Sequence, residues 1–130
     1  MTTAIGENGV MPSTCPCGLS QPYTVCCGSL HQGRATAVTA EQLMRSRYTA
    51  FVMHDADYLR RTWSLSTRPA AIEFDPDRRW TGLEILGTTG GSAFHTEGTV
   101  EFNAHHNTGV QHENSRFTRE AGEWVYVAAL

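Results

Sequence analysis

The sequence predicts an α+β fold in which helices come first and an antiparallel sheet follows. Apolar residues recur at helical spacing between residues 39 and 63, and the second half of the chain alternates apolar and polar residues between glycine-containing turns. Helices that precede a sheet in this way usually cover one of its faces, so we expect a curved sheet packed on helices. A cysteine cluster near the N-terminus forms a separate small element.

Size and composition fit one compact domain with a short appendage. The chain has 130 residues, 40% hydrophobic and 18% charged, as in globular proteins. A formal net charge of −3 gives no general attraction to nucleic acid or anionic lipid. We see no apolar run long enough for a membrane span and no secretory pattern at the N-terminus, and we therefore expect a cytoplasmic protein.

All four cysteines lie in one short segment. Cys15 and Cys17 form one pair, and Cys26 and Cys27 form a second pair after eight intervening residues. In a reducing compartment such a cluster indicates metal binding rather than disulfides. Zinc prefers four ligands at tetrahedral corners, and four thiolates leave no position for a reactive water. We therefore expect a structural rather than a catalytic zinc ion.

His31 is the alternate ligand, because it lies four residues after Cys27 and could replace one sulfur. Adjacent cysteines can both bind one metal if the backbone bends between them, and we favour that arrangement. Gly18 and Gly28 follow the two pairs and permit backbone turns. The alternatives are free thiols on a mobile tail, or a redox site, which the absence of CxxC spacing disfavours.

The segment CPCGLSQPYTVCCGSLHQG resembles the SEC-C motif, a zinc-binding segment also found at the C-terminus of the SecA translocation ATPase. That motif reads Cys-x-Cys, eight residues, then Cys followed by His or Cys. The resemblance implies that His31 lies outside the metal shell and that the ligands are Cys15, Cys17, Cys26 and Cys27. In SecA the element contacts a chaperone and the ribosome. A protein partner bound through the zinc element is therefore a hypothesis for this chain.

A first helix is expected after a short connection over residues 32–39. Thr39 is its predicted N-cap, and Gln42 completes a capping box. Residues 45–47 fall mostly on the side opposite to an apolar face that contains Leu43, Met44, Tyr48, Phe51 and Val52. A second helix is expected to start after Asp55 and to end at residues 66–69, with one face formed by Tyr58, Leu59 and Trp63.

Four strands are expected over residues 80–88, 94–103, 110–118 and 123–128. Short turns at residues 90–91, 106–109 and 120–122 join them, so the sheet is antiparallel. One side of the second strand carries Phe94, Thr96, Gly98, Val100 and Phe102. The other side carries His95, Glu97, Thr99 and Glu101.

The body of the chain resembles the YchJ family of bacterial proteins. The resemblance is carried by residues 43–51, 57–63, 80–85, 112–113, 115–117 and 124–126. It implies a nuclear transport factor 2-like (cystatin-like) cone over residues 34–130. Residues 1–33 would form the SEC-C zinc-binding element with a disordered N-terminal tail. The resemblance implies no established biochemical function.

We looked for acid–base groups that could work inside such a cone. His112 and Glu113 are adjacent and therefore face opposite sides of a strand. Glu113, Ser115 and Phe117 share one side, and a histidine facing a carboxylate across the sheet could do acid–base work. We interpret His95, His105 and His106 as surface or turn residues, and Trp63, Trp80 and Trp124 as core residues. We expect ion pairs, rather than an anion site, for Arg45, Arg47 and Arg116.

Two functions of different classes follow, and no catalytic residue is assigned. In the favoured one, a non-enzymatic module docks a partner through the zinc element, and the cone is its scaffold or homodimer unit; the cone pocket is then filled by side chains. In the other, an open apolar pocket binds a small molecule or acts as an isomerase or dehydratase, with an acid–base group of shifted pKa inside. Nucleic-acid binding comes third, because the net charge opposes a basic patch of Arg34, Arg45, Arg47, Arg60 and Arg61.

Overall fold

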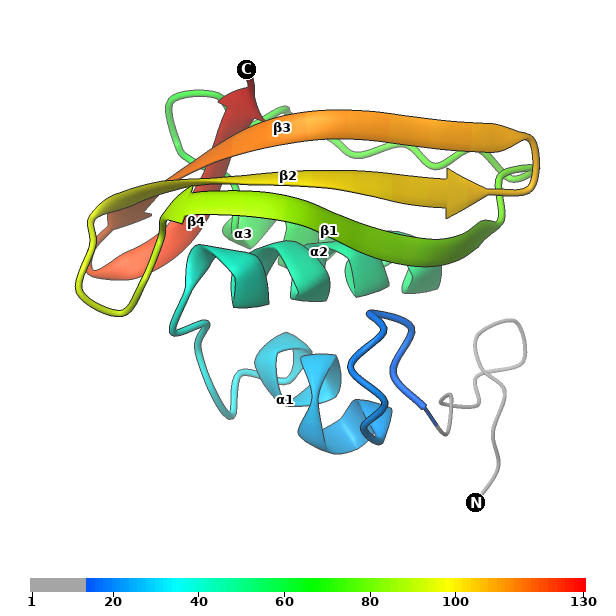
Figure 1. The fold of residues 1–130 in the computed structure, drawn as a ribbon, viewed down its shortest axis with the longest axis horizontal. Coiled ribbons are helices and arrows are strands. Elements are labelled where there is room, and N and C mark those ends of the chain that lie inside the picture. Colours follow the sequence, from blue (N-terminus) through cyan, green and yellow to red (C-terminus); the bar gives the residue numbers. More distant parts are fainter. Residues whose placement is uncertain (1–13) are drawn as a thin grey trace.

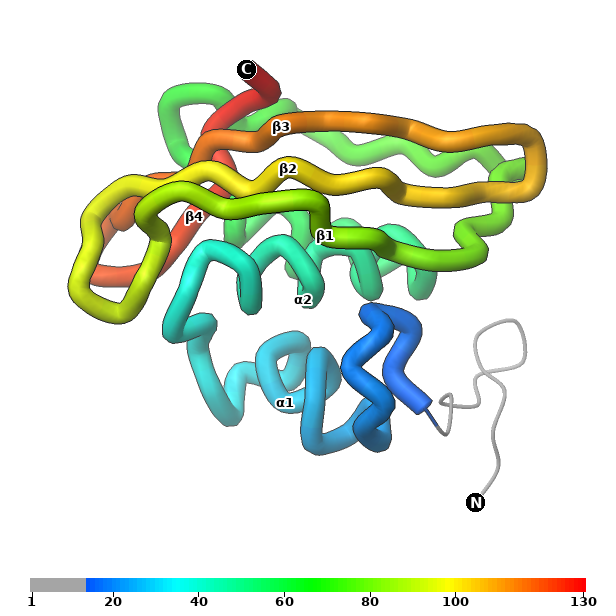
Figure 2. The backbone as a smooth tube through the Cα atoms, in the orientation of Figure 1, coloured from blue at the N-terminus to red at the C-terminus, as the bar shows by residue number. Residues whose placement is uncertain are grey.

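The molecule has three layers, a four-stranded sheet, a helical layer beneath it and a small cysteine-containing layer beyond the helices (Figure 1). This computed structural model describes residues 14–130. Helix α2 (Ala40–Met53) lies against the sheet with α3 (Ala56–Arg61) beside it. Helix α1 (Cys27–His31) and the cysteine segment lie on the side of α2 away from the sheet (Figure 2). The predicted α+β fold is confirmed, and the predicted tail falls outside the described residues.

Helix α2 begins at the predicted N-cap. The Thr39 hydroxyl oxygen accepts a hydrogen bond from the Gln42 main-chain N–H at 3.1 Å. Gln42 does not complete the capping box on Thr39, because its side-chain oxygen accepts from the main-chain N–H of Val38 at 2.7 Å. The helix ends at His54, which adopts the left-handed conformation with φ 57°.

Helix α3 is shorter than the sequence predicts. It starts after Asp55, as predicted, and the Asp55 side chain caps it, but the helix ends at Arg61 rather than at residues 66–69. The cause is pairing with the sheet, because Trp63 forms an isolated bridge with Tyr126. Within residues 14–130, no helix combines the length and the apolar character that crossing a membrane requires.

The sheet has strand order β1-β2-β3-β4, and each neighbouring pair is antiparallel. The strands span Trp80–Gly90 (β1), Glu97–His106 (β2), Gly109–Glu120 (β3) and Glu123–Ala129 (β4). Two register shifts interrupt the pairing of β1 with β2, and one interrupts the pairing of β3 with β4. Such irregularities bend strands and increase their twist, and the sheet arches over α2 in Figure 1.

Strand β2 starts later than predicted, at residue 97 rather than 94. Gly91, with φ 74°, donates its N–H to the carbonyl of Glu97 at 2.9 Å, so the chain between these residues forms the turn. Phe94 lies in that turn and is 96% exposed. The predicted inward side of the strand is otherwise right, because Val100 and Phe102 are buried.

The main core lies between α2 and the sheet, and it contains Leu43, Met44, Tyr48, Val100, Phe102, Phe117 and Trp124. Burial does not stop at this face of α2. Ser46 and Arg47, which the sequence placed on the opposite side, are 0% and 3% exposed. A second cluster explains this, because it joins Ala50 of α2 to Leu30 of α1 and Leu59 of α3. Helix α2 is therefore covered on several sides.

The closing turn of the β1–β2 hairpin gives the first prediction. A Cβ on Gly98 would lie 2.5 Å from the main-chain N and Cα of Gly91, and neither backbone atom can move aside cheaply. We expect Gly98→Ala to lower the free energy of unfolding by about 1–3 kcal/mol. Gly87→Ala, in the same hairpin but with nothing within 4 Å of the new Cβ, is the matched control and should change it by less than about 1 kcal/mol. Urea unfolding measures both, and equal losses would contradict this packing.

Candidate metal centre

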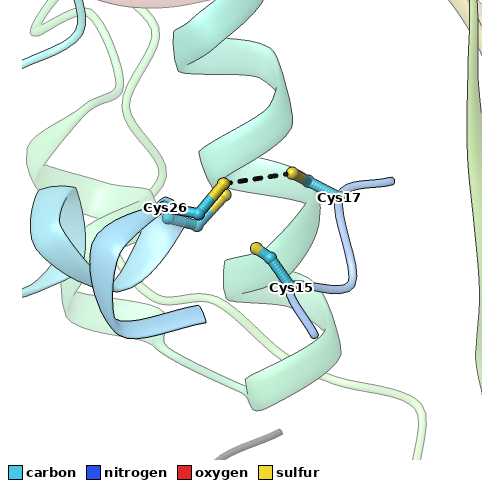
Figure 3. A group of neighbouring side chains, drawn as sticks. Cys15, Cys17 and Cys26 are labelled. Atoms are coloured by element: carbon cyan, nitrogen blue, oxygen red, sulfur yellow. Dashed lines mark hydrogen bonds between the residues drawn. The ribbon is translucent and has the colours of Figure 1, made fainter. Parts of the chain in front are cut away.

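The first cysteine pair sits in a closed turn. The Cys15 N–H donates to the Gln21 carbonyl at 2.7 Å, which folds the following residues back on the cysteine. Gly18 has φ 95°, so the turn that follows the pair needs the conformational freedom that the sequence predicted there. The side chains of Cys15 and Cys17 both point toward α1 and Cys26 in Figure 3.

The second pair comes from the junction of two short helices. The 3-10 helix η2 (Tyr23–Val25) ends at Cys26, and α1 starts at Cys27. Cys26 has φ −108° and ψ −117°, which is neither helical nor extended. The backbone thus bends between the adjacent cysteines, as the sequence analysis required for both sulfurs to reach one centre.

The four sulfur atoms of Cys15, Cys17, Cys26 and Cys27 all lie within 4.8 Å of one another. The Sγ atoms of Cys17 and Cys26 are 3.6 Å apart, marked by the dashed line in Figure 3. A tetrahedral zinc with four sulfurs at about 2.3 Å needs sulfur–sulfur distances of about 3.8 Å. All of the cysteines except Cys26 are buried, and none is in a disulfide. The cluster could therefore hold one metal ion of zinc's size and ligand preference.

Neighbouring thiols and burial shift the pKa of three of the cysteines in different directions. Hydrogen bonds from Cys17 and Cys27 lower the pKa of Cys15, and the bond with Cys15 raises the pKa of Cys27. Burial, together with the bond to Cys17, raises the pKa of Cys26 to about 12. Four thiolates can coexist here only with a compensating positive charge, which a divalent cation would supply.

Side chains of α2 fix the cysteine segment in place. The Thr49 hydroxyl lies 3.8 Å from the Cys15 sulfur, and Thr49 is fully buried. Arg45 donates from Nη1 to the Cys17 carbonyl at 2.7 Å while its Nε pairs with Glu41 at 3.0 Å. The candidate centre is therefore built against one face of α2.

His31 makes two hydrogen bonds within the protein. Its Nε2–H donates to the Ser46 carbonyl at 2.9 Å, which leaves Nδ1 as the acceptor of the Tyr23 hydroxyl at 2.7 Å. Both ring nitrogens of this buried, neutral histidine are thus engaged. Gly28 allows Tyr23 this position, because a Cβ there would lie 2.6 Å from the Tyr23 carbonyl oxygen. Close packing, rather than the turn predicted from the sequence, is the reason for that glycine.

The five arginines considered for a basic patch all make hydrogen bonds within the protein. Each donates to a main-chain carbonyl: Arg34 to Thr24, Arg45 to Cys17, Arg47 to Leu59, Arg60 to Pro69 and Arg61 to His31. The expectation of ion pairs holds for Arg45 but is wrong for Arg47 and Arg116, which have no carboxylate partner among the described residues. Arg47 instead lies 4.9 Å from the ring centre of Trp63 and 4.7 Å from that of Tyr126.

Histidine–carboxylate pairs do form across the sheet, but on its exposed face. His112 Nε2 lies 2.7 Å from Glu101, and His105 Nε2 lies 3.2 Å from Glu84. All four side chains are at least 42% exposed. Water competes for such groups, so these pairs do not make a catalytic pocket.

A pocket of about 370 Å³ lies between α2, the concave face of the sheet and the segment before β1. Glu113 faces it, and its Oε2 accepts hydrogen bonds from Ser115 at 2.6 Å and Tyr126 at 2.9 Å. The sequence placed Glu113, Ser115 and Phe117 on one side of their strand but assigned no role to the Glu113 carboxylate. The sequence pattern could have indicated its position, because Glu113 and Ser115 share one side of β3 with Phe117. The full burial of Phe117 marks that side as the inward one.

The tryptophans take different positions around this pocket. Trp124 is 2% exposed in the core, as predicted. Trp63 and Trp80 are half-buried and line the pocket. The interpretation as core residues is therefore right for Trp124 and in part for Trp80, which packs against the same core, whereas Trp63 lies outside it.

Comparison with known proteins places the chain in a family. The profile described as "YchJ, middle NTF2-like domain" matches residues 39–129. The chain is 62% identical to a UPF0225 protein of Streptomyces coelicolor over 112 residues, which cover 86% of this chain and 90% of that protein. It is 60% identical to a UPF0225 protein of Streptomyces avermitilis over 116 residues, which cover 89% and 83%. The chain belongs to the YchJ family, as the sequence resemblance implied.

Two solved structures share the fold. A SEC-C motif containing protein from Rhodopseudomonas palustris is 32% identical with a TM-score of 0.75, covering 90% of this chain and 97% of its own. A SEC-C motif containing protein from Psychrobacter arcticus is 30% identical with a TM-score of 0.70, covering 88% and 80%. The expected NTF2-like cone is thus confirmed, and both neighbours carry the motif that the cysteine segment resembles.

Buried His31 gives a prediction about pH. Burial lowers the pKa of His31 below its usual value of 6.5, so the unfolded chain binds this proton first as the pH falls. The stability of the folded protein should therefore be complete above about pH 6.5 and decline below it, by up to about 1.4 kcal/mol per pH unit from this group. Urea unfolding between pH 7.5 and 5.5 measures the decline.

His31→Gln is the control, with zinc loading followed at each pH. The variant should be less stable at pH 7.5 but lose less stability on acidification, since metal release affects both proteins alike. Identical declines in the two proteins would show that His31 does not titrate as described.

Proposed function

We propose that Cys15, Cys17, Cys26 and Cys27 bind one structural Zn²⁺ and that the protein is a non-enzymatic interaction module. The observation that carries the proposal is the convergence of four sulfurs, all within 4.8 Å of one another and most of them buried. Four thiolates close the zinc shell, so the metal would hold shape rather than activate water. We place the module in the cytoplasm, where reducing conditions keep the thiols free for metal.

The docking surface in this proposal is the loop between the cysteine pairs, residues 18–25. Most of it is exposed, including Leu19 at 46% and Val25 at 66%. Exposed apolar side chains on a metal-stapled loop suit a protein partner, because the loop loses little conformational freedom on binding. The structural neighbours are named for a SEC-C motif, which supports reading this segment as the same metal-binding element. The cone is then the scaffold that displays the loop.

A second candidate function is small-molecule binding in the cone. The docking hypothesis expected side chains to fill the pocket, yet a space of about 370 Å³ remains open. That volume is in the range of known ligand pockets. The two functions use different parts of the molecule and are compatible with one another.

Metal analysis tests the structural zinc. We expect one zinc per chain, and Cys15→Ser and Cys27→Ser should each lose it together with several kcal/mol of stability (about 2–5). His31→Ala should lose stability but retain the metal, since both its ring nitrogens bond within the protein. If Cys27→Ser keeps its zinc and His31→Ala loses it, the fourth ligand is His31 rather than Cys27. A metal-free protein with unchanged folding and thermal stability would refute the structural role.

Affinity capture from lysate tests the docking surface. A Leu19→Ser, Val25→Ser variant should keep its zinc and its fold but lose the partners that the intact protein captures. Leu65→Ser, which changes a 74% exposed leucine in the loop after α3, is the matched control and should keep them. Partners retained by the loop variant would remove this function, whatever the zinc content.

A further inference from the structure

The pocket has an aromatic wall, and only a few of its polar groups are buried. Its apolar lining comes mainly from Tyr48, Phe51, Trp63, Phe74, Trp80 and Tyr126. These side chains reach it from α2, from the segment between α3 and β1, from the start of β1 and from β4. Rings of this kind favour a flat apolar body, and the polar groups at the inner end decide what that body carries.

Arg47 is the buried cation of the pocket, and it is 3% exposed. The other charged residues of the lining before β1 are less buried: Arg78 is half-buried, and Glu73 and Asp75 are exposed. Its Nη1 donates to the Leu59 carbonyl and to the Thr62 hydroxyl, both at 2.8 Å. No carboxylate of residues 14–130 lies within 4 Å of its guanidinium nitrogens. The N–H groups on Nε and Nη2 have no hydrogen-bond partner in that part of the chain. A buried guanidinium without a counter-ion is costly, and this one retains the edge that binds carboxylates in a bidentate manner.

A second unpaired donor lies beside Arg47. The indole Nε1–H of Trp63 is buried and finds no acceptor among the described residues. The Arg47 guanidinium carbon lies 4.9 Å from the centre of the Trp63 ring, so the two groups are neighbours. Buried donors are normally satisfied, so the unpaired indole N–H, beside an arginine edge that makes no hydrogen bond, indicates a missing acceptor.

Glu113 is not the acceptor for Arg47 and Trp63, and its carboxylate limits the negative charge that a ligand in the pocket can carry. Its Oε2 accepts from Ser115 and Tyr126 rather than from Arg47. A ligand with two negative charges would meet the Glu113 carboxylate in the same pocket. One negative charge matches the one buried positive charge of the pocket, that of Arg47, without adding repulsion.

We propose that the pocket binds a small aromatic monocarboxylate, whose carboxylate accepts hydrogen bonds from Arg47 and Trp63 while its ring packs among the pocket aromatics. This inference rests on the small-molecule function proposed above and is independent of zinc-dependent docking. It assigns Arg47 and Trp63 as the residues that determine ligand class.

The experiment is titration of the full-length, zinc-loaded protein, followed by calorimetry and by NMR of the Arg47 Nε–H and Trp63 Nε1–H signals. The probes are 3-phenylpropionate, its neutral amide and the dianion benzylphosphonate. We expect the carboxylate to bind about tenfold more tightly than the amide, as a charge-assisted hydrogen bond implies, and to shift both N–H signals. The dianion should bind more weakly than the carboxylate.

Trp63→Phe keeps the ring and removes only the N–H, so it should reduce carboxylate affinity about threefold to tenfold and leave amide affinity nearly unchanged. Trp80→Phe is the matched control in the same pocket and should affect both probes equally. Arg47→Met should abolish the preference for carboxylate if it folds, and the Trp63 pair keeps the test valid if it does not.

The outcomes separate the two claims. Equal affinity for acid and amide, or a dianion that binds most tightly, would overturn the carboxylate assignment and leave small-molecule binding standing. No binding of any probe, with both N–H signals unmoved, would overturn the carboxylate assignment and the pocket function together.

Discussion

Helix α2 has four neighbours, the sheet, the cysteine segment, α1 and α3, and a different set of its groups contacts each of them. Leu43, Met44 and Tyr48 pack against the sheet. Thr49 and the guanidinium of Arg45 contact the cysteine segment. The Ser46 carbonyl accepts a hydrogen bond from His31 of α1. Arg47 turns toward α3 and the pocket. One helix of 14 residues thus connects the core, the candidate metal centre and the pocket, and the placement of each depends on it.

The cysteine layer needs this support because it is too small to hold itself together. Its helix α1 has five residues, and isolated helices of that length are unstable in water. Hydrogen bonds from Arg34, Arg45 and Arg61 to its carbonyl groups tie the layer internally and to the helices, but four clustered thiols resist full ionisation. A metal would neutralise the clustered thiolates and cross-link them. Metal binding and packing of the layer on α2 would then be one event.

The sequence was a good guide wherever a local rule decides the structure. Thr39 caps α2 and α3 starts after Asp55, both as predicted, and glycine-containing turns between alternating segments predicted the antiparallel order. It failed where tertiary contacts override periodicity. The α2 side with Ser46 and Arg47 looked polar because no local signal says that α1 and α3 cover it. Trp63 fitted a helical face but bridges to Tyr126, 63 positions later. Both residues line the pocket, which therefore depends on that distant contact.

The central claim is that four sulfurs, and no nitrogen, enclose a metal against α2. X-ray absorption spectroscopy at the zinc edge of the purified protein tests this most directly. We expect a first shell of four sulfurs at about 2.3 Å, with no nearer light atom. A shell with a nitrogen or oxygen at about 2.0–2.1 Å would contradict it, because His31 or water would then have taken the place of a thiolate.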